Sequence, residues 1–170
     1  TPFKNDFSID FDAIKNLVDF LINNGINYIV VQGTTGESST MTNDEKIMSR
    51  KAFVDANHGR IPLVLGLGSN DTMSLLNELK DADCNGYSAI LSVTPYYNKP
   101  SMKGLYNHFS LLAQTSKLPI ILYITEMRDG TPTSNIIPLS VTTLDAADVN
   151  ASETNPKAGQ TRFTFNDPIY

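Results

Sequence analysis

The chain has 170 residues, of which 41% are hydrophobic and 18% charged, and its net charge at neutral pH is -5. These values fit a soluble globular domain, and the acidic balance argues against nucleic acid or an anionic membrane surface as the main partner. No apolar run reaches the ~18 residues of a membrane span, and nothing at the start signals export, so we expect a cytoplasmic protein. The lone Cys84 rules out an intrachain disulfide, and His58 and His108 have no cluster of cysteines or carboxylates beside them in the sequence, which argues against a structural zinc site.

Helices and strands are predicted to alternate up to about residue 124. Apolar residues recur at helical spacing from Phe11 to Leu21, and Gly25 is a stop signal. Thr42, with Glu45 three residues later, predicts a capping box for a second helix. The further predicted elements are strand 27–31, helix 43–57, strand 61–67, helix 71–81, strand 87–93, a helix capped by Ser101 that ends near 115, and strand 118–123.

This alternation predicts βαβ units and a parallel α/β sheet buried on both faces. A TIM barrel and an open doubly wound sheet both fit the pattern. We expect residues 1–124 to form this domain, and 125–170 to be a divergent or poorly ordered C-terminal segment, because the latter are rich in polar and turn residues. Within that segment only 135–144 and 161–170 carry enough apolar residues for a short element or an edge strand.

The loop from Gly33 to Glu37 directly follows the apolar run from Ile29 to Val31. Its glycines allow a sharp turn, and Thr34 and Thr35 place two hydroxyl groups where a strand ends. In strand–helix proteins this is where ligands bind. The loop suits a small carboxylate, which hydroxyl and backbone N–H groups would hold.

Tyr96, Tyr97 and Tyr123 also stand at predicted strand ends. Carboxyl ends of parallel strands open on one face, so we expect these phenols to converge with the two threonine hydroxyls, and such a series can pass protons. The alternative is that the tyrosines are packing residues. Arg128, five residues beyond Tyr123, is either a carboxylate ligand or a solvated loop residue.

Several motifs together resemble the dihydrodipicolinate synthase family. They are Gly33-Thr34-Thr35-Gly36-Glu37-Ser38, Val93-Thr94-Pro95-Tyr96-Tyr97-Asn98-Lys99-Pro100, Gly104-Leu105-Tyr106-Asn107-His108-Phe109, Thr1-Pro2-Phe3, Gly59-Arg60-Ile61-Pro62 and Leu118-Pro119-Ile120-Ile121-Leu122-Tyr123. The match covers about residues 1–124, in order and at family spacing. The resemblance implies a TIM (β/α)8 barrel, of which this chain covers about half before an atypical polar tail.

The family resemblance also implies an activity. Such a lyase condenses pyruvate with aspartate semialdehyde through a lysine Schiff base, in lysine and diaminopimelate biosynthesis, without a cofactor or metal. By motif, Thr34, Tyr97 and Tyr123 would relay protons, and Thr35 would hold the pyruvate carboxylate. Arg128 would take the semialdehyde carboxylate. Tyr97 would be donated across the interface of a homodimer or homotetramer.

The family resemblance also bears on a regulatory lysine pocket and on the nucleophilic lysine. Ser38, Asn70 and Tyr96 resemble parts of a pocket where lysine exerts feedback, although Asn43 stands where a pocket histidine often occurs. The family's Gly-Ile/Val-Lys-Glu-Ala motif is not found in the sequence. Lys157 is the candidate for the Schiff-base lysine, and a lysine after Asn-Pro also fits a solvated turn.

Other interpretations stay open. The chain is either part of a longer enzyme or a shortened relative that binds carboxylates without catalysis. Another pyruvate-dependent aldolase, such as N-acetylneuraminate lyase, is the alternative activity. A flavodoxin-like domain fits the βα units, but the sequence has no phosphate-loop signature.

Overall fold

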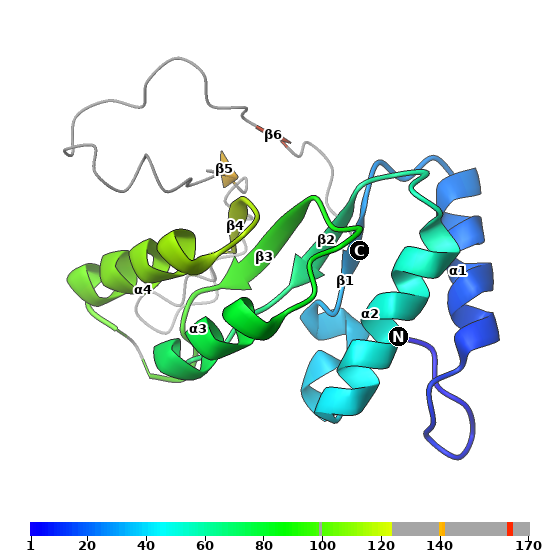
Figure 1. Cartoon of the computed structure of the whole chain (residues 1–170), viewed down its shortest axis with the longest axis horizontal. Helices are drawn as coiled ribbons and strands as arrows, with labels where there is room; N and C mark the ends of the chain where they lie inside the picture. The colour runs from blue at the N-terminus through cyan, green and yellow to red at the C-terminus, as the bar shows by residue number, and fades with distance from the viewer. Residues whose placement is uncertain (99, 124–139, 142–162, 165–170) are drawn as a thin grey trace, which may run out of the picture. The chain divides into compact units, whose positions relative to one another are not determined.

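Helices and strands alternate along the chain from Phe11 to Tyr123 (Figure 1). The computed structural model describes residues 1–98, 100–123, 140–141 and 163–164. The elements are α1 (Phe11–Asn23), β1 (Ile29–Val31), the 3-10 helices η1 (Thr34–Gly36) and η2 (Ser38–Thr40), α2 (Asn43–Asn57), β2 (Leu63–Gly66), α3 (Thr72–Asp81), β3 (Ala89–Val93), α4 (Met102–Thr115), β4 (Ile120–Tyr123), β5 (Ser140–Val141) and β6 (Phe163–Thr164).

The main sheet has the strand order β1-β2-β3-β4. β1 and β2 run parallel, with Val30 paired to Val64, which confirms the parallel α/β sheet predicted from the sequence. β5 and β6 form a separate antiparallel pair with Val141 opposite Phe163. These two short strands fall inside the segments 135–144 and 161–170, the parts of the C-terminal segment with enough apolar residues for a short element or an edge strand.

Local signals set the ends of the elements. α2 begins and ends at Asn43 and Asn57, as predicted, because the capping box forms. The Thr42 N–H donates to Glu45 Oε2 at 2.8 Å, and the Glu45 N–H donates to Thr42 Oγ1 at 3.3 Å. β2 begins two residues later than predicted, after Pro62, because proline has no N–H to extend the ladder.

One compact unit comprises Thr1–Leu67 and Asp83–Ile90. In it, α1 packs against α2. Its fully buried side chains include members of α1, α2, the first two strands and the start of β3: Ile14, Val18, Val31, Ser49, Leu63, Leu65 and Ile90. Burial of the Ile, Val and Leu side chains of this set, at about 1.5–3 kcal/mol each, stabilises the packing of the helices on the strands.

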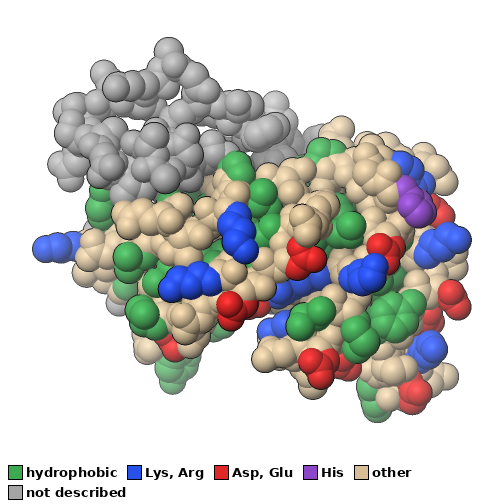
Figure 2. Space-filling model, viewed as in Figure 1, with side chains coloured by type: hydrophobic (Ala, Val, Ile, Leu, Met, Phe, Trp, Pro, Cys, Tyr) green, Lys and Arg blue, Asp and Glu red, His purple; other side chains and the backbone are tan. Residues whose placement is uncertain are grey.

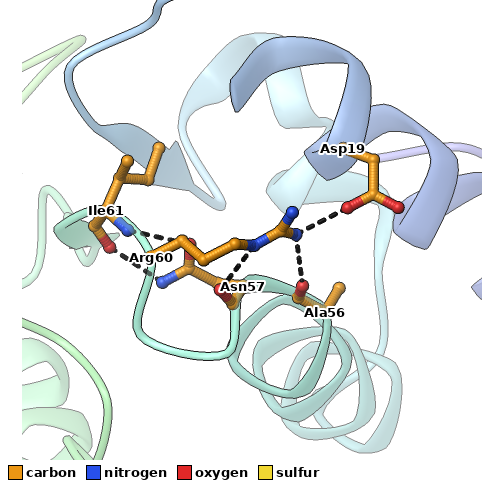
Figure 3. Close-up of polar contacts among 5 residues, drawn as sticks. All are labelled: Asp19, Ala56, Asn57, Arg60 and Ile61. Carbon is orange, nitrogen blue, oxygen red and sulfur yellow. Dashed lines mark hydrogen bonds and ion pairs between the residues drawn. The ribbon is translucent and has the colours of Figure 1, made fainter. Parts of the chain in front are cut away.

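The C-terminal end of α2 is fixed by side chains (Figure 3). The Arg60 guanidinium donates to the carbonyl oxygens of Ala56 and Asn57 at 2.8 and 3.0 Å, which satisfies carbonyls that the helix leaves open. It also pairs with Asp19 of α1 at 2.6 Å. The Asn57 amide bonds both backbone groups of Ile61, so the turn into β2 is fixed by the same cluster.

A second compact unit comprises the described residues of Gly68–Ala82 and Leu91–Tyr170. The boundary between the two units therefore passes through β3. In the second unit α3 packs against α4, and Leu75 and Leu79 of α3 and Leu112 of α4 are fully buried. Ser101 is the N-cap of α4, as predicted, and Asp71, predicted to be the first residue of its helix, is the N-cap of α3.

Charged side chains of both signs are intermixed on the face shown in Figure 2, which displays no large field of one sign. Such a distribution offers no extended basic surface on that face for a polyanion. Within the described residues, every helix is too short or too polar to span a bilayer.

Candidate active site

The loop over residues 33–37, called the GTTGE loop below, forms a tight turn at the carboxyl end of β1. Gly33 is extended, and η1 follows, closed by hydrogen bonds from the Gly36 N–H to Gly33 O and from the Glu37 N–H to Thr34 O at 2.9 and 3.0 Å. The side chains of Thr34 and Thr35 are exposed. The turn therefore presents two hydroxyl groups to solvent at the strand end, as the sequence predicted.

The residue before this loop was not identified from the sequence. Gln32 is 5% exposed and has a left-handed backbone with φ 62°. Non-glycine residues rarely adopt this conformation, and they persist in it only where their surroundings hold them. The signal available in the sequence was an amide side chain directly after the apolar run Val30-Val31. Gln32 turns the chain out of β1 and so sets where the GTTGE loop begins.

Gly66, at the end of β2, accommodates this turn. A Cβ atom placed on Gly66 would lie 2.5 Å from the carbonyl oxygen of Gln32 and 3.0 Å from the nitrogen of Gly33. Only glycine permits this close approach of two backbones. The start of the GTTGE loop is thus packed directly on the neighbouring strand.

The second unit carries the tyrosines. β3 leads into a turn in which the Asn98 N–H donates to Tyr96 O at 2.9 Å. Tyr97 has φ 69° and its side chain is 94% exposed. A tyrosine with a left-handed backbone that contributes nothing to the core is typical of a functional position, where strain is tolerated for the sake of the side chain's placement.

Tyr123 ends β4, next to the turn that carries Tyr97. Its carbonyl oxygen accepts a hydrogen bond from the Thr94 N–H at 2.9 Å, and its side chain is 39% exposed. The structure therefore brings Tyr123 and the β3 turn to adjacent strand ends in one unit. Thr34 and Thr35 lie in the other unit, and the convergence of all these hydroxyls stays a prediction.

The remaining candidate residues fall into two groups. Ser38 is half-buried at the start of η2, Asn70 is exposed just before the N-cap of α3, and Tyr96 is 51% exposed. Arg128 and Lys157 lie outside the described residues. The lysine pocket, the semialdehyde ligand and the Schiff-base lysine thus stay predictions.

His108, which lies in one of the family-like motifs, is a buried polar group. It lies on α4, 3% exposed, and its Nδ1 is 2.8 Å from Thr72 Oγ1 at the start of α3. Burial lowers the pKa of the imidazole, so the neutral form is favoured. Its role in the second unit is to join α3 to α4. Among the described residues, no group of three or more His, Cys, Asp or Glu side chains could hold a metal ion.

Comparisons with known proteins agree on one family. A model of the dihydrodipicolinate synthetase family matches residues 1–148. The 4-hydroxy-tetrahydrodipicolinate synthase of Flavobacterium psychrophilum is 50% identical over 141 residues, which are 83% of this chain and 47% of that relative. The crystal structure of dihydrodipicolinate synthase from Acinetobacter baumannii, complexed with pyruvate, aligns with a TM-score of 0.71 and 40% identity, over 76% of this chain and 45% of that one.

A second activity is represented among the structural relatives. An N-acetylneuraminate lyase from Mycoplasma synoviae aligns with a TM-score of 0.65 and 26% identity, over 75% of this chain and 45% of that one. In each of these comparisons the chain spans about half the length of the relative it matches.

Proposed function

The chain belongs to the dihydrodipicolinate synthetase family, and on that premise we propose that it acts in a lyase that condenses pyruvate with aspartate semialdehyde. Its likeness to solved synthases confirms the TIM-barrel class, of which it contains βα units around a parallel sheet. The observation that carries the proposal is the GTTGE loop. It is a fixed turn at a strand end that exposes two adjacent hydroxyl groups.

We assign the carboxylate of pyruvate to Thr35. A hydroxyl and the N–H groups of a tight turn are suitable donors to a carboxylate, and such charge-assisted bonds are stronger than neutral ones. We assign the carboxylate of the second substrate, aspartate semialdehyde, to Arg128, because a guanidinium can donate two parallel hydrogen bonds to one carboxylate.

Proton transfer falls to Thr34, Tyr97 and Tyr123. In the reaction a lysine amine adds to the pyruvate ketone and water is lost, which gives the imine. Loss of a methyl proton then gives an enamine, whose carbon attacks the aldehyde. Protons leave the amine and reach the departing hydroxyl, and hydroxyl groups that both donate and accept can carry them. A Schiff-base lysine must be neutral, and burial among apolar groups produces that state.

A second copy of the chain is part of this proposal. Tyr97 is almost fully exposed and has a left-handed backbone, which supports a role at the surface of a neighbouring subunit. The assembly would be a homodimer or homotetramer. A lyase for N-acetylneuraminate is the second candidate, supported by the structural likeness at 26% identity. The synthase is favoured because its representatives reach 50% identity.

The test is reduction of the purified chain with borohydride in the presence of pyruvate, followed by mass analysis of its peptides. We expect one lysine to gain the mass of pyruvate, less water, plus two hydrogens. Absence of an adduct on every lysine would contradict the proposal. Turnover assays with aspartate semialdehyde and with N-acetylneuraminate then separate the two candidate activities.

Site variants locate the reaction. T35V should raise the pyruvate concentration needed for half-maximal trapping by roughly tenfold or more, the effect of losing a hydrogen bond to a charged group. T34V and Y123F should instead slow trapping at saturating pyruvate by about 100-fold, the usual contribution of a proton-transfer group. S39A is the matched control, because Ser39 is an exposed hydroxyl residue of the same segment, and it should change neither value.

A further inference from the structure

A cluster of hydrogen bonds from the buried side chains of Gln32 and Ser49 and the half-buried side chain of Arg50 joins the start of the GTTGE loop to α2. Gln32 Nε2 donates to the carbonyl oxygen of Lys46 at 2.7 Å and to Ser49 Oγ at 2.8 Å. Gln32 Oε1 accepts a hydrogen bond from Arg50 Nε at 2.7 Å. Both donors and the acceptor of this amide are therefore used, and all three partners belong to one helix.

Arg50 fixes the orientation of the Gln32 amide. A guanidinium group carries only donors, so it requires the amide oxygen on its side. The amide nitrogen must then face Lys46 O and Ser49 Oγ, both of which can accept a hydrogen bond. Arg50 is itself held through its carbonyl oxygen, which accepts from the Tyr87 hydroxyl at 3.0 Å.

Ser49 connects the two ends of the segment between Gln32 and Met41. It is fully buried, and its Oγ lies 3.9 Å from the Met41 sulfur as well as 2.8 Å from Gln32 Nε2. Met41 directly follows η2, so the GTTGE loop and η2 leave the protein interior at Gln32 and return to it at Met41. The Ser49 hydroxyl on α2 thus contacts both Gln32 and Met41, the residues at the two ends of this exposed segment.

The left-handed backbone of Gln32 links this cluster to the threonines. With φ 62° at Gln32, the chain enters Gly33 in a direction that an extended residue would not give. The bonds of the side-chain amide hold this conformation, and Gly66 leaves room for it on the other side. The direction of the Thr34 and Thr35 side chains therefore depends on the contacts that Gln32 makes with α2 and with Gly66.

We propose that Gln32, Ser49 and Arg50 are positioning residues that set the Thr35 hydroxyl for a carboxylate ligand. The ligand in this statement rests on the proposed function, whereas the control of the loop by the cluster stands on the contacts alone. None of the three side chains needs to touch the substrate. Their effect reaches it through the backbone of residues 32–35.

The experiment compares variants of the full chain. R50M removes the donor that orients the amide, R50K restores a donor, and Q32M removes the amide itself. K51M is the matched control, because Lys51 is the next residue on α2 and its ammonium pairs with Asp55 at 2.8 Å on the exposed side. Pyruvate is the probe, followed by the concentration dependence of borohydride trapping.

R50M and Q32M should raise the half-maximal pyruvate concentration about tenfold. They should also slow trapping at saturating pyruvate, because Thr34 belongs to the same turn as Thr35. R50K should recover most of this loss, and K51M should match the unmodified chain. In a T35V background, R50M should not raise the half-maximal pyruvate concentration any further, because the guanidinium affects pyruvate binding through Thr35. Additive effects of R50M and T35V on the half-maximal pyruvate concentration would overturn the proposal. An effect of K51M as large as that of R50M would also overturn it.

Hydrogen exchange of the amides of residues 33–37 decides the positioning role even without an adduct. R50M and Q32M should increase exchange there about tenfold, with α4 unchanged as an internal reference, and K51M should leave both unchanged. If the unmodified chain never reacts with pyruvate but this exchange pattern appears, the proposed function fails and the positioning role stands. Equal exchange in R50M and K51M would refute the positioning role itself.

Discussion

Replacement of Gly66 by alanine tests the packing of the candidate loop most directly. The new Cβ would lie 2.5 Å from Gln32 O and 2.8 Å from Gln32 C. Carbon contacts are favourable only at about 3.5–4.0 Å, so one backbone must move by about 1 Å. Gln32 cannot yield easily, because its amide is bonded to Lys46 O, Ser49 and Arg50.

The expected change in the free energy of unfolding of G66A follows from two opposing effects. Alanine reduces the entropy of the unfolded chain, which stabilises a protein by about 0.4–1 kcal/mol where the backbone permits it. Gly66 does not have a positive φ, so no dihedral penalty is added. Overpacking against rigid backbone costs about 1–3 kcal/mol, and we expect the upper end. The net prediction is a loss of about 2 kcal/mol in the free energy of unfolding.

Chemical denaturation measures this loss, and G33A is the matched control. The Cβ of an alanine at position 33 would meet only Val30 Cγ1, at an ordinary 3.5 Å, so G33A should be neutral or slightly stabilising. The amide resonances of Gln32 and Gly33 should shift in G66A and remain in place in more distant glycine variants such as G104A. A G66A protein as stable as G33A would refute the close approach and, with it, the account of how the loop begins.

The other predictions concern the packing of each unit. N57A should destabilise the chain by about 1–3 kcal/mol in a denaturant titration, because it leaves the half-buried N–H and carbonyl groups of Ile61 without the side-chain amide that pairs them. D19N should cost less than about 1 kcal/mol in the same assay, because its ion pair with Arg60 is partly exposed. Since burial lowers the pKa of His108, the unfolded chain binds its proton more readily. The stability that this group contributes should be complete above about pH 6.5 and fall as the pH drops below it, by at most about 1.4 kcal/mol per pH unit. H108N should flatten the pH dependence of the unfolding free energy below about pH 6.5, and an unchanged slope would contradict this assignment.

Much of the fold could be predicted because its signals are local. A capping box requires only Thr42 and Glu45, and the N-caps Asp71 and Ser101 act on the next turn of their own helices. Strand starts were predicted too early, since a ladder requires a partner, and Pro62 offers no N–H for it. The pairing partner of a strand is a property of the fold and is not visible in the strand's own residues.

The candidate site was predictable where its residues are conspicuous and not where they act through packing. The hydroxyls of Thr34 and Thr35 and the phenol of Tyr123 stand at strand ends, which the alternation of elements locates. Gln32 gave only a weak signal, because an amide after an apolar run also fits the end of a strand. Its partners on α2 and the close contact with Gly66 join residues 14 or more positions apart. Such contacts form only when the helices and strands pack against one another.

The contacts that fix the GTTGE loop all lie within one compact unit. Gln32 is bonded to α2, Gly66 belongs to the adjacent strand, and Tyr87 closes the cluster from the segment that precedes β3. Tyr97 and Tyr123 belong to the other unit and contribute none of these contacts. Carboxylate binding at Thr35 and proton transfer through the tyrosines are therefore separable by mutation. Tyrosine variants should change only the limiting rate, whereas variants in the Gln32 cluster should raise the half-maximal pyruvate concentration, so this concentration reports on the unit that carries the GTTGE loop.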